Sequence, residues 1–137
     1  MSYLDILGPQ ITLDEGKRSK MYLDSRGIPT IGIGHNLRDR VISERAIQVI
    51  FEDDVAIAEI DARALVKTFD ELSDVRKAAV VNLAFNMGYA VLSQFKRTLA
   101  LIDAGDFSSA ADALLESRYA AQVGARALRV ADALRRG

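Results

Sequence analysis

The chain of 137 residues contains no cysteine and no tryptophan, and it has a single histidine. Without cysteine it forms neither a disulfide nor a thiolate metal site, and one histidine excludes a zinc site built from several imidazoles. We therefore expect no metal and no cofactor. No apolar run approaches the roughly 20 residues that a membrane span needs, and the N-terminus lacks the basic and apolar regions of a signal peptide. A soluble protein made in the cytoplasm is expected.

Charge is nearly balanced overall, at −1, but it is distributed unevenly. Residues 44–74 hold nine acidic against three basic side chains, and residues 117–137 hold five arginines against one aspartate. Such runs are commonly solvated helix faces, and the alternative is that the arginine-rich end faces an anionic polymer. The basic stretch is small and lacks interleaved aromatic residues, so nucleic acid is not expected as a partner.

The spacing of apolar and turn-forming residues predicts an α+β fold in a single domain. Pro9 is expected in the first turn of a helix that ends near Gly16. A β-hairpin follows, with strands at residues 20–24 and 28–34 around a turn at residues 24–27. Ser43 is the expected N-cap of a long helix that runs to Val66.

The remaining residues predict helices only. The expected helices are a buried central helix at 75–86, one that ends near Gly105, one after Asp106, and a last one at about 124–135. The predicted organisation is a small hairpin lobe at about 14–42, a linking helix at about 43–66, and a helical lobe at about 67–137 that also includes the N-terminal helix.

Three residues near the N-terminus are candidates for catalysis. Glu15 lies at the end of the first predicted helix, where the negative end of the helix dipole disfavours an anion and favours a carboxylic acid that keeps its proton. Asp24 opens the predicted turn, and Thr30 lies in the strand that follows. Each also has an ordinary explanation, as a surface glutamate, a turn aspartate and a β-branched strand residue.

Glycine alternates along one face of the predicted strand at 28–34. Because strand side chains point to alternate faces, Thr30, Gly32 and Gly34 share one face, and two isoleucines share the other with His35. Glycine is unfavourable in a strand unless something approaches its backbone closely. A flat sugar ring could bind over Gly34, and a bulge or a tight contact within the protein is the alternative.

His35 is not expected to be a catalytic base, because it shares the face of the isoleucines. Asp54 lies on the predicted apolar stripe of the long helix, one turn after Ile50. A carboxylate on a buried stripe needs a partner. We therefore predict a structural ion pair between His35 and Asp54.

Two amides, Asn82 and Asn86, lie one turn apart on the helix that is predicted to be buried, with Phe85 beside the second. Buried amides commonly satisfy backbone groups. Alternatively, these two line a cleft and bind the hydroxyl and N-acetyl groups of a sugar.

Together these residues resemble the phage-type lysozyme family, whose members are endolysins or muramidases. The block DEGKRSKMYLDSRGIPTIGIGH at residues 14–35 resembles the catalytic signature of that family, which has Glu-Gly, then Tyr-x-Asp, then Thr-Ile-Gly-x-Gly-His. The resemblance continues at FEDDV (51–55) and VNLAFNMG (81–88), and more weakly at FKRTLALIDAGDFSSAADALLESRY (95–119). It implies a lysozyme-like fold.

The resemblance also implies a function, which is hydrolysis of the β-1,4 bond between N-acetylmuramic acid and N-acetylglucosamine. In this reading Glu15 protonates the leaving oxygen. Asp24 assists a water or stabilises the oxocarbenium-like transition state, and Thr30 helps to hold that water. The family is described as inverting, so we expect enough room for a water between the carboxylates.

By the same resemblance, the residues that contact substrate are Asn36, Phe85 and Thr98, with Arg118 and Arg126 at basic positions near the cleft. Two departures from the family stand out. Arg26 occupies a turn position where an acidic residue can occur, so it cannot pair with Arg118. Tyr119 replaces a frequent tryptophan.

A phage endolysin implies bacterial peptidoglycan as the partner of a monomeric enzyme. It implies synthesis in the host cytoplasm and action on the periplasmic wall after a holin breaches the inner membrane. One alternative is a lytic transglycosylase, which forms an anhydro sugar without an attacking water. Another is a structural or virion protein that binds peptidoglycan and has lost catalysis. The presence of Asp24 and Thr30 argues against the first, and the intact trio argues against the second.

Overall fold

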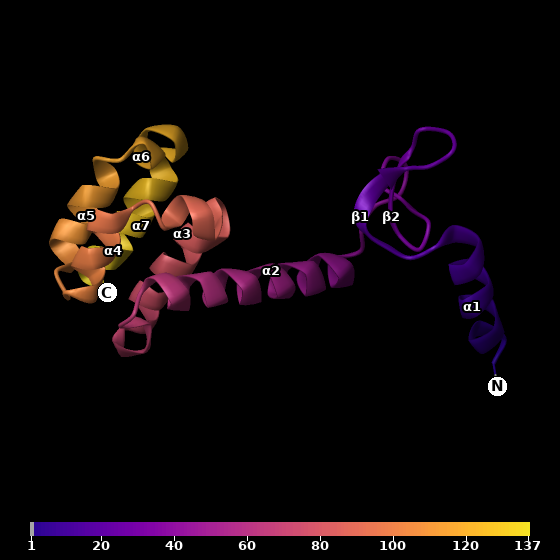
Figure 1. Cartoon of the computed structure of the whole chain (residues 1–137), viewed down its shortest axis with the longest axis horizontal. Coiled ribbons are helices and arrows are strands. Elements are labelled where there is room, and N and C mark those ends of the chain that lie inside the picture. Colours follow the sequence, from indigo (N-terminus) through magenta and orange to yellow (C-terminus); the bar gives the residue numbers. More distant parts are fainter. Residues whose placement is uncertain (1) are drawn as a thin grey trace. The chain divides into compact units, whose positions relative to one another are not determined.

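The computed structural model describes residues 2–137, and the chain divides into two compact units, residues up to Gln48 and residues from Val49 onward. The first unit contains α1 (Tyr3–Glu15), β1 (Arg18–Leu23), β2 (Pro29–Gly32) and β3 (His35–Asn36) (Figure 1). The long helix α2 (Glu44–Leu65) begins in the first unit and continues into the second. Helices and one small sheet make up the described residues, so the predicted α+β class is confirmed.

Helix α1 begins earlier than predicted, and Pro9 lies in its interior rather than in its first turn. The helix begins at Tyr3 because the Asp5 carboxylate accepts a hydrogen bond of 2.7 Å from the Ser2 N–H, which satisfies a backbone donor at the N-terminus. Pro9 has no N–H, so one backbone bond of the helix is missing. Gly16 ends the helix with a φ of +76°, as predicted.

The predicted hairpin is present, with its turn at residues 24–27, but the second strand is shorter than predicted. β2 ends at Gly32, and a turn at Ile33 and Gly34 leads into β3, which pairs antiparallel with β2. The prediction of a continuous strand over 28–34 was therefore wrong beyond Gly32. The physical reason is that φ is +66° at Gly32 and +71° at Gly34, values that an extended strand does not adopt.

Thr30 occupies the middle of this three-stranded sheet. It pairs with Tyr22 of β1 on one side and with Asn36 of β3 on the other. Its side chain is 4% exposed. Ile31 pairs with His35, so these two share a face as expected, although they do so across two strands rather than along one.

Helix α2 is capped as predicted, because the Ser43 hydroxyl accepts a hydrogen bond from the Ala46 N–H at 3.1 Å. Its buried residues are Ala58 and Ala62 only. The earlier part of the predicted stripe is not buried, since Ile50 is 51% exposed. The side chain of Asp54 is exposed as well, so it does not lie on a buried stripe.

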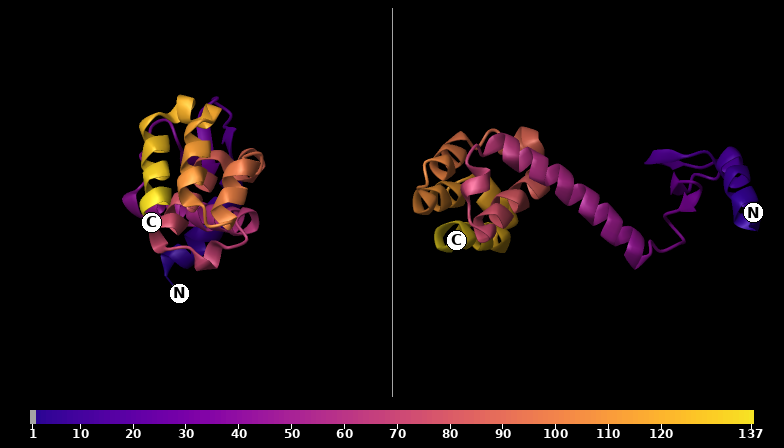
Figure 2. Two further views of the ribbon diagram at one scale, coloured as in Figure 1. Left: turned by 90° about the vertical axis from the view of Figure 1, so that its left-hand side faces the viewer. Right: turned by 90° about the horizontal axis from the view of Figure 1, so that it is seen from below.

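The second unit contains a 3₁₀ turn, η1 (Phe69–Glu71), and the helices α3 (Asp74–Leu92), α4 (Lys96–Asp103), α5 (Phe107–Leu115), α6 (Arg118–Val123) and α7 (Ala125–Arg136). Helix α5 lies beside both α4 and α7, and α3 also packs against α7 (Figures 1 and 2). Leucine and isoleucine side chains from these helices are fully buried at Leu83, Leu92, Ile102, Leu114 and Leu134. This is the hydrophobic core of the unit. No helix of residues 2–137 is long and apolar enough to cross a membrane.

Helix α3 differs from the prediction in length and in burial. It extends to Leu92 across a break at Gly88, where φ is +76°. One face is buried, around Leu83, while Asn82 and Asn86 are exposed. The expectation that this helix is buried all round was wrong, because the face that carries Asn82, Phe85 and Asn86 lines open pockets.

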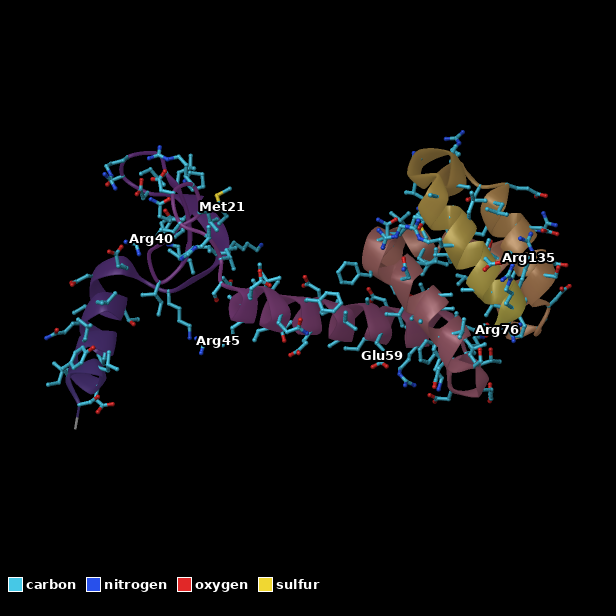
Figure 3. All side chains as sticks on the ribbon, turned by 180° about the vertical axis from the view of Figure 1, so that it is seen from behind. Met21, Arg40, Arg45, Glu59, Arg76 and Arg135 are labelled. Atoms are coloured by element: carbon cyan, nitrogen blue, oxygen red, sulfur yellow. The ribbon has the colours of Figure 1, made fainter. Side chains whose placement is uncertain are left out.

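Arg76 of α3 holds the C-terminal end of α7. Its Nε donates to the Leu134 carbonyl at 2.7 Å and its Nη2 to the Arg135 carbonyl at 3.0 Å, while the guanidinium lies 3.7 Å from the ring centroid of Phe107. Figure 3 shows Arg76 and Arg135 at this end of the unit. One side chain thus satisfies two carbonyls that the helix itself leaves unpaired.

Replacing Arg76 with alanine is expected to lower the free energy of unfolding by about 2 kcal/mol, because hydrogen bonds from a charged donor and a cation–π contact are lost together. Arg136→Ala is the control, since Arg136 makes only an exposed pair with Asp132 and should cost less than about 0.5 kcal/mol. Urea denaturation of both variants measures the difference, and equal losses would contradict the role assigned to Arg76.

Candidate active site

The carboxyl group of Glu15 lies against the turn at Gly34. A Cβ atom at Gly34 would lie 2.9 Å from Cδ of Glu15 and 3.0 Å from both Cγ and Oε2. Within this unit no hydrogen bond or ion pair engages the carboxyl group. The close approach expected at Gly34 is therefore made by the side chain of Glu15. The sequence had left two explanations open, a bound sugar and a tight contact within the protein, and this is a contact of the second kind.

Asp24 organises the turn between β1 and β2. Its Oδ1 accepts hydrogen bonds from the backbone N–H groups of Arg26 at 2.8 Å and of Ile28 at 2.9 Å. The Gly27 N–H donates to the Asp24 carbonyl at 2.9 Å. Aspartate is well suited to this position because its short side chain reaches N–H groups that lie a few residues ahead. Oδ2 accepts no bond from residues 2–137.

The surroundings of Asp24 favour its ionised form. The hydrogen bond from the Ile28 N–H lowers the pKa of the Asp24 carboxyl, and loss of solvation opposes this effect. The Arg26 N–H and the positive charges of Arg26 and Arg38 lower the pKa further. Arg26, which departs from the family pattern, thus helps to keep Asp24 charged.

Thr30 is tied to the same backbone segment as Asp24. Its Oγ1 donates to the Ile28 carbonyl at 2.8 Å, while the N–H of Ile28 is the donor to Asp24. The hydroxyl proton is therefore in use, and the oxygen retains its capacity to accept a hydrogen bond.

The other predicted site residues of this unit are Asn36 and His35. The Asn36 amide is occupied locally, because its Oδ1 accepts from the N–H groups of Arg38 and Asp39 at 2.9 Å and its Nδ2 donates to Asp39 at 3.0 Å. Nε2 of His35 is buried and has no hydrogen-bond partner within the unit. Asp54 belongs to the other unit, so the predicted ion pair stays a prediction.

The remaining predicted residues belong to the second unit and fall into two pockets. Thr98 and Asn86 line an open pocket of about 730 Å³ together with Arg118 and Tyr119. Phe85 and Arg126 line a second pocket of about 550 Å³. The structure brings each of these pairs together, although the members of the first pair are twelve residues apart in the sequence.

Arg126 and Phe85 are each held by a neighbour in the second pocket. The guanidinium Nε of Arg126 donates to Oδ1 of Asn82 at 2.9 Å. The ring of Phe85 lies 6.0 Å from that of Phe51, at a tilted angle. Asn82 therefore bonds to a side chain while it also lines this pocket, and its bond to a sugar stays a prediction.

Sequence reasoning missed the polar character of the larger pocket. Its lining includes Lys96 and Arg97 of α4 in addition to Arg118. Tyr119 is 5% exposed, stacks edge-on against Phe95, and has a hydroxyl group without a partner among the described residues. Burial raises the pKa of this hydroxyl group, and the charge of Arg126 opposes the change. The adjacent Lys96 and Arg97 were visible in the sequence, but their proximity to Arg118 was not.

Two carboxyl groups in contrasting surroundings, one charged and hydrogen-bonded and the other unpaired, suit acid–base cleavage of a glycosidic bond. The described residues hold no group of three or more His, Asp or Glu side chains placed to bind a metal ion. The class of protein that this fold and site indicate is a glycoside hydrolase.

Comparison with known proteins identifies the family. The family model described as phage lysozyme matches residues 13–136. The chain is 30% identical to the Probable T4-type lysozyme 2 of Dictyostelium discoideum, over 90% of each chain. It is 30% identical to the Endolysin of Salmonella phage P22, over 74% of this chain and 73% of that protein.

A third relative contains a similar sequence within a larger protein. The chain is 29% identical to the Pre-baseplate central spike protein Gp5 of Enterobacteria phage T4, over 85% of this chain but only 25% of that protein. The chain thus belongs to the phage lysozyme family. It is a lysozyme, a glycoside hydrolase that acts on peptidoglycan.

The role of Asp24 in the turn and its expected role in catalysis are separable by substitution. Asp24→Asn keeps an acceptor for both N–H groups, so we expect a folded protein that loses activity by about 10²-fold or more. Asp24→Ala removes the acceptor too and should be both inactive and less stable. Circular dichroism melting and a turbidity assay on cell walls measure the two properties, and equal stability losses in both variants would contradict the turn role.

The pH dependence of stability follows from the lowered pKa of Asp24. The stabilisation from this carboxylate is complete above its unfolded pKa, near pH 4, and is lost as the pH falls through the lower folded value. The free-energy advantage of the wild type over Asp24→Asn should therefore shrink below about pH 4. Denaturation curves for both proteins between pH 7 and pH 2 test this part of the prediction.

Proposed function

We propose that the chain cleaves the β-1,4 bond between N-acetylmuramic acid and N-acetylglucosamine with Glu15 as the general acid, and that it does so by inversion. The observation that carries this proposal is that Glu15, Asp24 and Thr30 all belong to one compact unit and to the segment matched by the family model. One small, locally folded segment therefore supplies the whole proposed catalytic trio.

Glu15 protonates the leaving oxygen of the glycosidic bond. Two features support this role. Its carboxyl group lies at the C-terminal end of α1, where the helix dipole disfavours a negative charge. No cation pairs with it within its unit, and Glu15 is exposed where its carboxyl group lies against Gly34. A carboxylic acid in such a place can donate a proton to the substrate.

Asp24 and Thr30 act together on the attacking water. Oδ2 of Asp24 is the oxygen left to accept a proton from that water, because both backbone bonds end on Oδ1. The oxygen of Thr30 can accept a hydrogen bond from the same water, since its own proton is directed to the Ile28 carbonyl. A water held by two acceptors presents a lone pair to the anomeric carbon, which is the requirement for single displacement with inversion.

Substrate contacts extend beyond the trio. We assign the backbone at Gly34 and the side chains of Phe85, Asn86, Thr98 and Arg126 to substrate binding, with Asn36 as a further candidate. Asn86 and Thr98 support this assignment because they line one pocket with cationic side chains. Asn36 is supported less, because its amide is occupied by the loop that follows it.

The proposed biological role is that of a phage endolysin. As a monomer made in the host cytoplasm, the enzyme would reach the periplasmic wall after a holin opens the inner membrane. The resemblance to an endolysin of a Salmonella phage over most of both chains supports this role. We further propose that the chain works as one lysozyme-like domain.

Glu15→Gln is expected to lower the release of soluble murein fragments by about 10²-fold or more, because glutamine cannot protonate the leaving oxygen. Asp14→Asn removes a charge from the adjacent residue of α1 and is the matched control, with activity close to wild type. The assay is run at low and at moderate salt. Because the protein is mildly acidic, its attraction to the anionic cell wall is weak, and low salt should favour activity. Undiminished activity of Glu15→Gln would refute the proposal.

The fragments released in the same assay report the reaction type. Reducing ends that appear first as the α-anomer indicate inversion, and β-anomers indicate retention. Anhydro-muramic ends would show a lytic transglycosylase. Binding to murein without any release would show a structural protein that has lost catalysis.

We also retain the proposal that His35 and Asp54 form an ion pair. The buried Nε2 of His35 supports it, since a buried ring nitrogen without a partner costs free energy. Asp54→Asn is expected to lower the free energy of unfolding more in the wild type than in a His35→Asn background, because the pair is already lost in that background. Urea denaturation measures both losses, with Asp53→Asn as control. Equal losses in the two backgrounds would show that the pair is absent.

A further inference from the structure

Among residues 2–137, Gly34 is the one glycine at which an added Cβ atom would meet a carboxyl group, and that group belongs to the proposed general acid. A Cβ atom at this position would lie 2.9 Å from Cδ and 3.0 Å from Oε2 of Glu15. Carbon atoms of separate side chains rarely approach below about 3.5 Å, so an added methyl group and the present carboxyl group cannot both keep their places.

The backbone at Gly34 cannot relieve this contact easily. The turn between β2 and β3 requires a φ of +71° there, and β3 is held on its far side by its pairing with β2. On the other side of the contact, Glu15 is the last residue of α1, and Gly16 directly follows it. The softest part of the contact is the Glu15 side chain, which would rotate away.

We propose that Gly34 is a positioning residue for the reaction, and that its missing side chain sets the place of the Glu15 carboxyl group. The inference rests on the proposed function, in which Glu15 is the acid. A carboxyl group held against the backbone of a turn loses rotamers that would carry it away from the glycosidic oxygen. Displacing a reacting group by about 1 Å can cost roughly 10²-fold in rate.

This role differs from the substrate contact that the sequence suggested for Gly34, and kinetics separates the two. A residue that only binds the sugar affects KM, because it acts on substrate and transition state alike. A residue that positions the acid affects kcat, and it changes the pH profile because the carboxyl group moves to different surroundings.

The experiment compares Gly34→Ala with Gly105→Ala. Gly105 has nearly the same φ, +77°, but a Cβ atom there meets no atom within 4 Å. Both variants carry the strain of a side chain at positive φ, and only the first also crowds Glu15. We expect similar decreases in Tm, a kcat lowered by about 10- to 100-fold in Gly34→Ala alone, and a shifted pH profile of kcat in that variant.

A second pair, Gly34→Asn and Gly105→Asn, covers the case in which alanine prevents folding. Asparagine tolerates positive φ better than alanine while still carrying a Cβ atom, so the loss in kcat should persist. An unchanged kcat in Gly34→Asn, or a loss found entirely in KM, would overturn the proposal while leaving Glu15 as the acid. Undiminished activity of Glu15→Gln would instead overturn the proposed function.

Discussion

The peptide groups of Ile28 hold in place Asp24 and Thr30, the two residues that we propose bind the attacking water. The N–H of Ile28 donates to the Asp24 carboxylate, and its carbonyl accepts from the Thr30 hydroxyl. Ile28 is itself buried, so the bonds to its backbone are shielded from competing water. Because both side chains are tied to one residue, the geometry between them follows from the hairpin and does not depend on the helical unit.

The two carboxyl groups of the site differ in what surrounds them. Asp24 receives two backbone N–H groups and the charge of two arginines, and its pKa is lowered accordingly. Glu15 has no such donors within its unit and meets a bare turn at Gly34. Such a contrast suits opposite roles for two residues of the same chemistry.

The turn at Gly34 connects this electrostatic contrast to the fold. Positive φ at Gly32 and Gly34 ends β2 early and brings β3 alongside it, which encloses Thr30 between two strands. The same missing side chain at Gly34 admits the Glu15 carboxyl group. Gly34, which appears in the sequence as part of a strand pattern, therefore serves the chain reversal and also leaves room for the Glu15 carboxyl group.

The local features of the protein were determined by the sequence. The end of α1 at Gly16, the turn at Asp24, the cap at Ser43 and the end of α4 near Gly105 follow from backbone preferences of single residues, and they were predicted correctly. The proposed trio could be suggested from the sequence because its members lie within sixteen residues. Such features depend on neighbours along the chain.

Other features were decided by tertiary structure, because they depend on contacts between distant segments. The pattern at 28–34 cannot distinguish a strand with glycines from two strands joined by a turn, since the difference lies in pairing between strands. The burial of α3 depends on which helices lie beside it. The sequence alone could therefore not show that Asn82 is exposed and accepts a hydrogen bond from Arg126 of α7. Spacing in the sequence could place Glu15 at the end of a helix, but only the folded unit shows that its carboxyl group meets the backbone of Gly34, nineteen residues later.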